Sequence, residues 1–149
     1  MKLPKLSDVV ILEPSEVQTT LSLGLYGAKV SAGFPSPAGD FMEGKLDLNE
    51  HLIKNPPATF FVRVIGDSMI GAGIHPDDLL VVDRSIDPKS GKIVIAVIDG
   101  ELTVKRLMLG GRGNNVFLVP ENPNYRQITI TEDMSFHIWG VVTFVIHKP

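Results

Sequence analysis

Turn-forming residues interrupt this chain of 149 residues throughout its length. It contains eleven prolines and fourteen glycines, and both residue types break helices and mark turns. Hydrophobic residues make up 44% of the sequence and charged residues 21%, which is ordinary for a globular protein with a core. The sequence therefore predicts one domain of many short strands, with at most a short appendage.

The pattern becomes that of a β protein at Thr59. The segments Lys92–Ile98 and Glu101–Leu109 flank Asp99-Gly100, a pair that favours the type I′ turn of a hairpin. We expect a mainly β fold, in the form of a small, twisted, partly closed barrel. The remaining expected strands are Thr59–Ile65, Leu79–Val82, Phe117–Val119, Gln127–Ile130 and Phe136–Ile146.

One short helix is expected ahead of these strands, around Leu48–Lys54. Asp47 or Asn49 can cap its first turn, because a short polar side chain accepts a hydrogen bond from a free backbone N–H there. The Asn55-Pro56-Pro57 sequence then ends it.

Residues 1–40 differ from the rest, because their apolar residues follow no sustained period. Within them, Ser31–Asp40 holds two prolines and two glycines, which indicates an extended and exposed segment. We therefore predict a flexible N-terminal arm over residues 1–40 and a folded domain over residues 41–149.

Composition excludes several kinds of site and location. The chain has no cysteine, so it forms no disulfide and no thiolate metal site. Its start lacks the pattern of a secretory signal, and its longest apolar stretches, Ile93–Ile98 and Val141–Ile146, are too short to span a bilayer. The net charge is −3 and no basic cluster exceeds two residues, so little direct nucleic-acid binding is expected. These features favour a cytoplasmic protein without membrane association.

A serine lies where a strand is expected to end, in Gly66-Asp67-Ser68-Met69. The backbone N–H groups of Asp67 and Ser68 can there face a developing oxyanion. Taken alone the motif is weak, because Gly-Asp-Ser sequences usually form ordinary turns.

Lys105 is the candidate base. In an extended strand Lys105 and Arg106 point to opposite faces, and Lys105 shares its face with Leu107 and Leu109. Burial among apolar groups lowers the pKa of a lysine, and the neutral amine can then take a proton from a serine hydroxyl. The alternative is a surface lysine that lies over the strand.

No histidine forms a convincing catalytic triad or metal site. The four histidines share no motif and no metal-ligand spacing, so we interpret them as structural or solvated and expect neither a metal nor a cofactor. They are His51, His75, His137 and His147.

The Ala32-Gly33 peptide bond has small residues on both sides and lies in the exposed, proline-bounded segment. Such a bond fits a narrow cleft. On its own it is also typical of a linker.

Together these features resemble the self-cleaving Ser–Lys protease family of UmuD and the LexA repressor. The resemblance covers about residues 29–147. It implies that Ser68 is the nucleophile, that Lys105 is the base, that the Ala32–Gly33 bond is cut, and that the domain forms a homodimer. The motifs that carry it, in order, are Ala32-Gly33-Phe34-Pro35-Ser36-Pro37-Ala38, Gly66-Asp67-Ser68-Met69, Asp99-Gly100-Glu101-Leu102-Thr103-Val104-Lys105-Arg106-Leu107, Pro120-Glu121-Asn122 and Trp139-Gly140-Val141-Val142.

Within that family the sequence is more similar to the UmuD branch than to the repressors. Only 32 residues precede the Ala32–Gly33 bond, which is too few for a helix-turn-helix domain and a linker. The Leu46-Asp47-Leu48-Asn49 stretch also resembles that branch. Two departures are that Ala32 stands in place of a cysteine and that the arm before it is somewhat longer than in the best-known member.

The UmuD branch implies a role in the SOS response to DNA damage. RecA filaments on single-stranded DNA then promote self-cleavage, and the product joins a UmuC-like, Y-family polymerase subunit in error-prone translesion synthesis. Two alternatives remain open at this point. One is the dimerisation and autocleavage domain of a LexA-like or phage-type regulator, and the other is a binding module with an inactive dyad.

Overall fold

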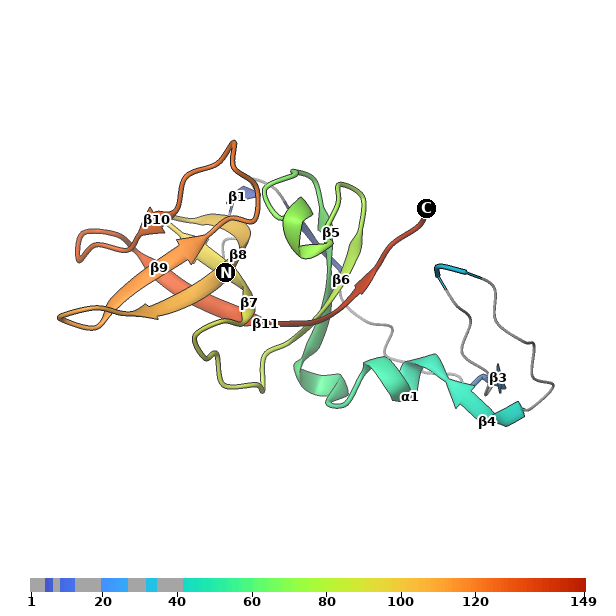
Figure 1. Cartoon of the computed structure of the whole chain (residues 1–149). Helices are drawn as coiled ribbons and strands as arrows, with labels where there is room; N and C mark the ends of the chain where they lie inside the picture. Colours follow the sequence, from blue (N-terminus) through green and yellow to red (C-terminus); the bar gives the residue numbers. More distant parts are fainter. Residues whose placement is uncertain (1–4, 7–8, 13–19, 27–31, 35–41) are drawn as a thin grey trace. The chain divides into compact units, whose positions relative to one another are not determined.

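The computed structural model describes residues 5–6, 9–12, 20–26, 32–34 and 42–149 (Figure 1). They belong to two compact units. The larger unit combines Met1–Pro14 with Asn55–Pro149, and the smaller one is Ser15–Lys54. Most of the arm expected over residues 1–40 lies outside the described residues.

The larger unit is built on one β-sheet. Its described strands are β1 (Lys5–Leu6), β2 (Val9–Leu12), β5 (Thr59–Val64), β6 (Leu79–Asp83), β7 (Ile93–Ile98), β8 (Glu101–Gly110), β9 (Asn115–Val119), β10 (Ile128–Thr129) and β11 (Phe136–Ile146). The order across the sheet is β10-β9-β8-β7-β11-β6-β5-β2, with antiparallel neighbours, and β1 pairs in parallel with β8. The mainly β fold class is confirmed, and the described strands leave the sheet open between β10 and β2.

The expected hairpin joins β7 to β8. Asp99 and Gly100 both have positive φ angles, 49° and 82°, as a type I′ turn requires. This turn sets the register, which places Val94 opposite Lys105 and Ala96 opposite Thr103. The position of Lys105 on the sheet is therefore fixed by a local turn that can be recognised in the sequence.

The long strand β11 connects the two halves of the sheet (Figure 1). Its first half pairs with β7 and its second half with β6. The approach to β6 is close at Gly140, where an added Cβ would lie 2.7 Å from Val82 Cγ1 and 3.2 Å from Asp83 O. Glycine is needed here because a side chain does not fit against β6.

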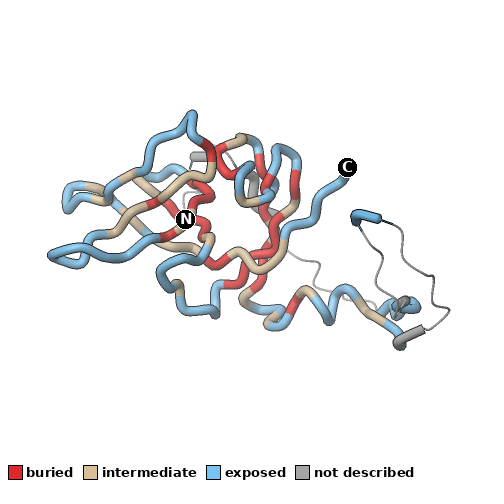
Figure 2. Tube along the Cα trace, viewed as in Figure 1, coloured by how far each residue is buried: buried red, intermediate tan, exposed pale blue. Residues whose placement is uncertain are grey.

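Two hydrophobic clusters form the core, and they use opposite faces of β7. Ile95 and Val97 belong to the first cluster, whereas Val94 and Ala96 belong to the second, as the two-residue period of a strand dictates. Figure 2 shows the buried residues running along the central strands, with exposed residues in the connections. A sheet buried on both faces explains why β7 is an almost unbroken apolar run.

The smaller unit contains β3 (Ser22–Tyr26), β4 (Met42–Asp47) and the helix α1 (Leu48–Leu52). The strands are antiparallel. The Asp47 side chain accepts a hydrogen bond of 3.0 Å from the backbone N–H of Asn49, so the expected helix and its Asp47 cap are confirmed. The helix ends at Leu52, before the Asn55-Pro56-Pro57 sequence, because Ile53 is already extended. Two short 3-10 helices, η1 (Pro56–Ala58) and η2 (Ile70–Ala72), belong to the larger unit.

The structure also has strands where the sequence analysis predicted none. All four described strands before Thr59, from β1 to β4, are of this kind. Their partners are distant in sequence or separated by a long connection, as when β2 pairs with β5 and β1 with β8. Short apolar runs such as Val9–Leu12 gain their strand geometry from this pairing and not from a local period.

The core clusters predict how a chain shortened to Gly33–Pro149 behaves. It loses β1, β2 and β3, but it keeps every residue of both clusters. We expect one cooperative urea transition, followed by circular dichroism, with a slope close to that of the full chain. A broad, non-cooperative transition would show that the first strands are part of the core.

Candidate active site

Ser68 lies just beyond β5, at the start of the connection to β6. Ser68 is only 4% exposed. Gly66-Asp67 turns the chain out of the strand, and η2 follows at Ile70. The serine is therefore held inside the larger unit by a short connection.

Lys105 reaches Ser68 from β8. Its Nζ lies 2.9 Å from Ser68 Oγ, 2.7 Å from Thr103 Oγ1 and 3.1 Å from the Val104 carbonyl oxygen. The residue is 5% exposed, so these contacts lie away from solvent. The two candidate residues, 37 positions apart in sequence, are thus brought into hydrogen-bonding contact.

Arg106 points to the opposite face, as expected from the strand period. Its Nε donates to Glu121 Oε1 at 2.6 Å and its Nη1 to the Gly91 carbonyl at 2.7 Å. Its side chain is about one-third exposed, so it keeps its charge near water. The two adjacent basic residues therefore occupy very different environments.

The contacts of Lys105 are compatible with a charged or a neutral amine. A neutral amine has two N–H donors and one lone pair. When it donates to the Thr103 hydroxyl oxygen and the Val104 carbonyl, its lone pair can accept the proton of the Ser68 hydroxyl. The geometry is therefore suited to moving a proton from serine to lysine.

The connection that follows β9 braces the segment around Ser68. The Asn122 side chain donates to the Asp67 carbonyl at 2.9 Å, and the Tyr125 hydroxyl donates to the Asp67 carboxylate at 2.5 Å. The backbone N–H of Glu121 donates to the Ser68 carbonyl at 2.8 Å. The sequence predicted no role for Pro120-Glu121-Asn122 beyond its part in the family resemblance, because these contacts depend on the folded arrangement.

Gly71 completes this brace. Its N–H donates to the Glu121 carbonyl at 2.7 Å, and an added Cβ would lie 2.6 Å from that oxygen. Only glycine allows the two segments to approach so closely. Its φ angle is not in the left-handed region, so the constraint is space and not backbone strain.

Two backbone donors remain available beside the serine. Within the described residues, the N–H groups of Asp67 and Ser68 make no hydrogen bond to an acceptor. Ser68 also has no histidine contact in that part of the chain. The described arrangement is therefore a serine, an amine and free amide groups.

The four histidines fall into two groups. His51 on α1 and His137 on β11 are exposed, whereas His75 and His147 meet at Asp78. Burial raises the pKa of Asp78, but hydrogen bonds from the His75 backbone and the His147 ring, with the charge of both imidazoles, outweigh it and hold that pKa below its ordinary value. No motif or spacing in the sequence predicted that His75, Asp78 and His147 lie together.

Ala32 and Gly33 are exposed and form a bend in the smaller unit. The next residue, Phe34, is 91% exposed. The rest of the proline-bounded segment, residues 35–40, lies outside the described residues. Ser68 and Lys105 belong to the larger unit.

Comparison with known proteins identifies the family. Residues 24–143 match the family model described as Peptidase S24-like. The chain belongs to the Peptidase S24-like family. The resemblance to its UmuD branch is confirmed, and the chain is a self-cleaving serine peptidase of SOS mutagenesis. Within the described residues, no helix is long and apolar enough to cross a membrane.

Individual relatives cover nearly the whole S24-like chain. Protein SamA of Salmonella typhimurium is 46% identical over 140 residues, which cover 94% of this chain and 96% of SamA. Protein ImpA of Escherichia coli is 50% identical over 124 residues, which cover 83% of each protein. Protein MucA of Escherichia coli is 44% identical over 136 residues, which cover 91% of each.

The brace predicts an effect of Asn122→Ala on self-cleavage. The change removes the shorter of two hydrogen bonds to the part-buried Asp67 carbonyl, which keeps the Ile70 N–H at 3.4 Å. It frees the segment that carries Ser68, at a cost of about 0.5–1.5 kcal/mol. We expect slower cleavage, measured by gel densitometry at fixed pH, and a lower free energy of unfolding.

Asn124→Ala is the matched control, because only the backbone N–H of Asn124 takes part in the described contact with Asn122. We expect this variant to cleave and unfold like the parent. Equal effects of the two substitutions would mean that the brace does not position the serine.

Proposed function

We propose that Ser68 and Lys105 cut the Ala32–Gly33 bond of the chain itself. The observation that carries the proposal is the buried contact of 2.9 Å between Lys105 Nζ and Ser68 Oγ. A serine needs a base to become a nucleophile. A buried amine, close to the hydroxyl and held by two further oxygens, supplies that base.

The reaction proceeds through an acyl-enzyme. Neutral Lys105 takes the Ser68 proton while Oγ attacks the Ala32 carbonyl carbon, and the N–H groups of Asp67 and Ser68 stabilise the oxyanion. The C–N bond then breaks, and the Gly33 amine leaves with the proton from Lys105. Water, deprotonated by the same amine, hydrolyses the ester and releases a chain that ends at Ala32.

Tethering explains how an exposed bond with small side chains becomes the substrate. The bond lies in the same chain as the dyad, so its effective concentration is high and little binding energy is needed. Alanine and glycine place no bulk beside the scissile carbonyl.

The biological setting follows from the UmuD branch. The relatives support involvement in mutagenesis together with a polymerase. Beyond it, we propose that the chain acts as a cytoplasmic homodimer and that RecA filaments on single-stranded DNA promote its cleavage. The trimmed form then serves as an accessory subunit of a UmuC-like, Y-family translesion polymerase.

The cut itself is directly testable. Incubation of the purified protein at raised pH should give two fragments, one ending at Ala32 and one beginning at Gly33, because the exposed bond is the substrate of the dyad. Intact-mass spectrometry and N-terminal sequencing identify them. Ser68→Ala should remain whole and folded, and a new terminus at any other residue would refute the assignment.

The rate should depend on pH through Lys105. Burial lowers the pKa of a lysine below its ordinary value of about 10.4. While most chains still hold a protonated amine, cleavage should speed up by roughly tenfold for each pH unit, because only the neutral amine is active. The measurement is the single-turnover cleavage rate between neutral and alkaline pH.

Substitutions separate the two adjacent basic residues. Lys105→Ala and Lys105→Arg should both abolish cleavage, since a guanidinium stays protonated. Arg106→Ala, on the opposite face, should keep most of the parental rate. A flat pH profile for the parent, or an active Lys105→Arg, would remove Lys105 from the mechanism.

A further inference from the structure

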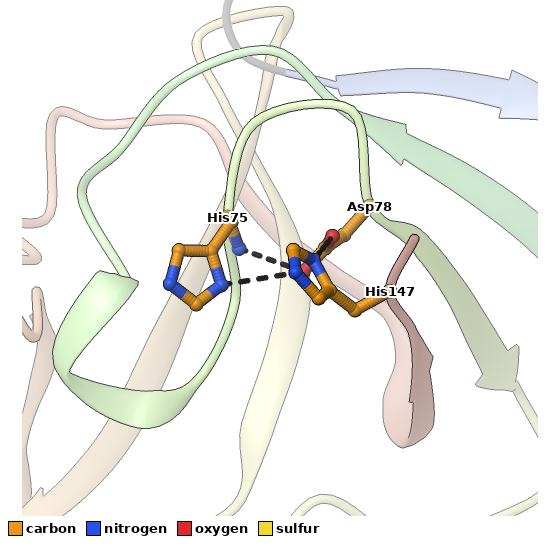
Figure 3. Close-up of side chains that lie close together, drawn as sticks. All are labelled: His75, Asp78 and His147. Carbon is orange, nitrogen blue, oxygen red and sulfur yellow. Dashed lines mark hydrogen bonds and ion pairs between the residues drawn. The ribbon is translucent and has the colours of Figure 1, made fainter. Parts of the chain in front are cut away.

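Three side chains that play no part in the proposed cleavage meet at one edge of the larger unit. They are His75, Asp78 and His147 (Figure 3). Each offers a metal-ligating atom, and these atoms all lie within 4.8 Å of one another. Figure 3 shows His75 and Asp78 on the connection before β6, and His147 on the segment after β11.

Strand pairing brings these residues together. In the antiparallel ladder, Ile146 at the end of β11 lies opposite Leu79 at the start of β6. The next residue of each strand along this register is His147 on one side and Asp78 on the other. Their atoms His147 Nδ1 and Asp78 Oδ1 are 2.5 Å apart, although the residues are 69 positions apart in sequence.

A tight turn adds the third member. The backbone N–H of His75 donates to Asp78 Oδ2 at 2.8 Å, and the Asp78 N–H donates to the His75 carbonyl at 3.1 Å. His75 Nδ1 then lies 3.8 Å from Asp78 Oδ2. The carboxylate is therefore fixed by backbone contacts between the two imidazoles, whose ring centres are 4.9 Å apart.

Burial differs sharply within the cluster. The Asp78 side chain is only 2% exposed, whereas His75 and His147 are about half exposed, at 48% and 47%. The Asp78 carboxylate is therefore held in place, whereas the imidazole rings of His75 and His147 are exposed enough to turn. The backbone donor to Asp78 resembles the outer hydrogen bonds that orient the ligands of metal sites.

We propose that His75, Asp78 and His147 bind a divalent transition metal ion, with Zn²⁺ as the best match. Two imidazoles and one carboxylate form a typical set for zinc, with a fourth position left for water. The exposed side of the two rings provides that position. Imidazole ligands disfavour Mg²⁺ and Ca²⁺, which bind through oxygen.

The geometry requires only small side-chain movements. Ligand atoms about 2.1 Å from a tetrahedral Zn²⁺ lie about 3.4 Å from one another. The pair at 2.5 Å must open slightly and the widest pair must close, and both imidazoles are exposed enough to turn. Binding displaces a proton from any imidazole nitrogen that coordinates the ion, so affinity should fall at low pH.

A bound ion would add a link between two parts of the fold next to the point where β11 pairs with β6. It would fasten the segment after β11 to the connection that runs from Ser68 through η2 to β6. Since the unfolded chain does not hold these ligands together, binding stabilises the folded state by mass action.

The test is calorimetric titration of the full, tag-free Ser68→Ala chain with Zn²⁺ after treatment with a chelator. This variant stays whole during the titration, and Ser68 lies outside the proposed metal site. We expect one ion per chain and a higher thermal midpoint with Zn²⁺ than with chelator. Co²⁺ should give the visible absorption of a low-coordinate site.

Three histidine variants in the same background decide whether the ion sits here. His75→Ala and His147→Ala should each weaken binding by at least about tenfold, the smallest loss that removal of an outer contact typically causes, because each removes a direct ligand. Both variants should still fold. His137→Ala, an exposed histidine elsewhere on β11, should bind like the parent. No saturable binding, or equal effects of all three substitutions, would overturn the proposal.

Discussion

The buried hydrogen bond between Lys105 and Ser68 is the constraint on which the rest of the structure depends. It has a cost, because an amine away from solvent loses the hydration that favours its charged form. With the lowered pKa that we propose for Lys105, the unfolded chain binds that proton more readily than the folded one. We therefore expect folding to be weakened at neutral pH and to regain stability as the pH rises toward the ordinary value of a lysine.

Strand pairing in the sheet determines where Lys105 and Ser68 lie. The Asp99-Gly100 turn sets the register of β8, and the strand period then turns Lys105 inward and Arg106 outward. Ser68 comes from the other half of the sheet, and β11 joins the two halves. The contact between Lys105 and Ser68 therefore forms only when both halves of the sheet are correctly paired. A shift of β8 by one residue would bury Arg106 and expose Lys105.

Local patterns were sufficient to predict the hairpin, the capped helix at Leu48–Leu52 and the strands from Thr59 onward. They failed wherever the partner lies far away in sequence. The strand Val9–Leu12 depends on pairing with β5, Asn122 braces Asp67 across 55 positions, and His147 meets Asp78 across 69. Local periodicity cannot predict a contact between residues so far apart in the sequence. The Ser68–Lys105 pair was predicted because the order of the motifs resembles that of the family.

The central claim is that Lys105 is neutral when it acts, and the most direct measurement is the titration of its own amine. In the Ser68→Ala chain, which stays whole, the nitrogen resonance of Lys105 Nζ can be followed by NMR across the alkaline range. We expect a midpoint well below the ordinary lysine value of about 10.4. A midpoint at that ordinary value would contradict the claim.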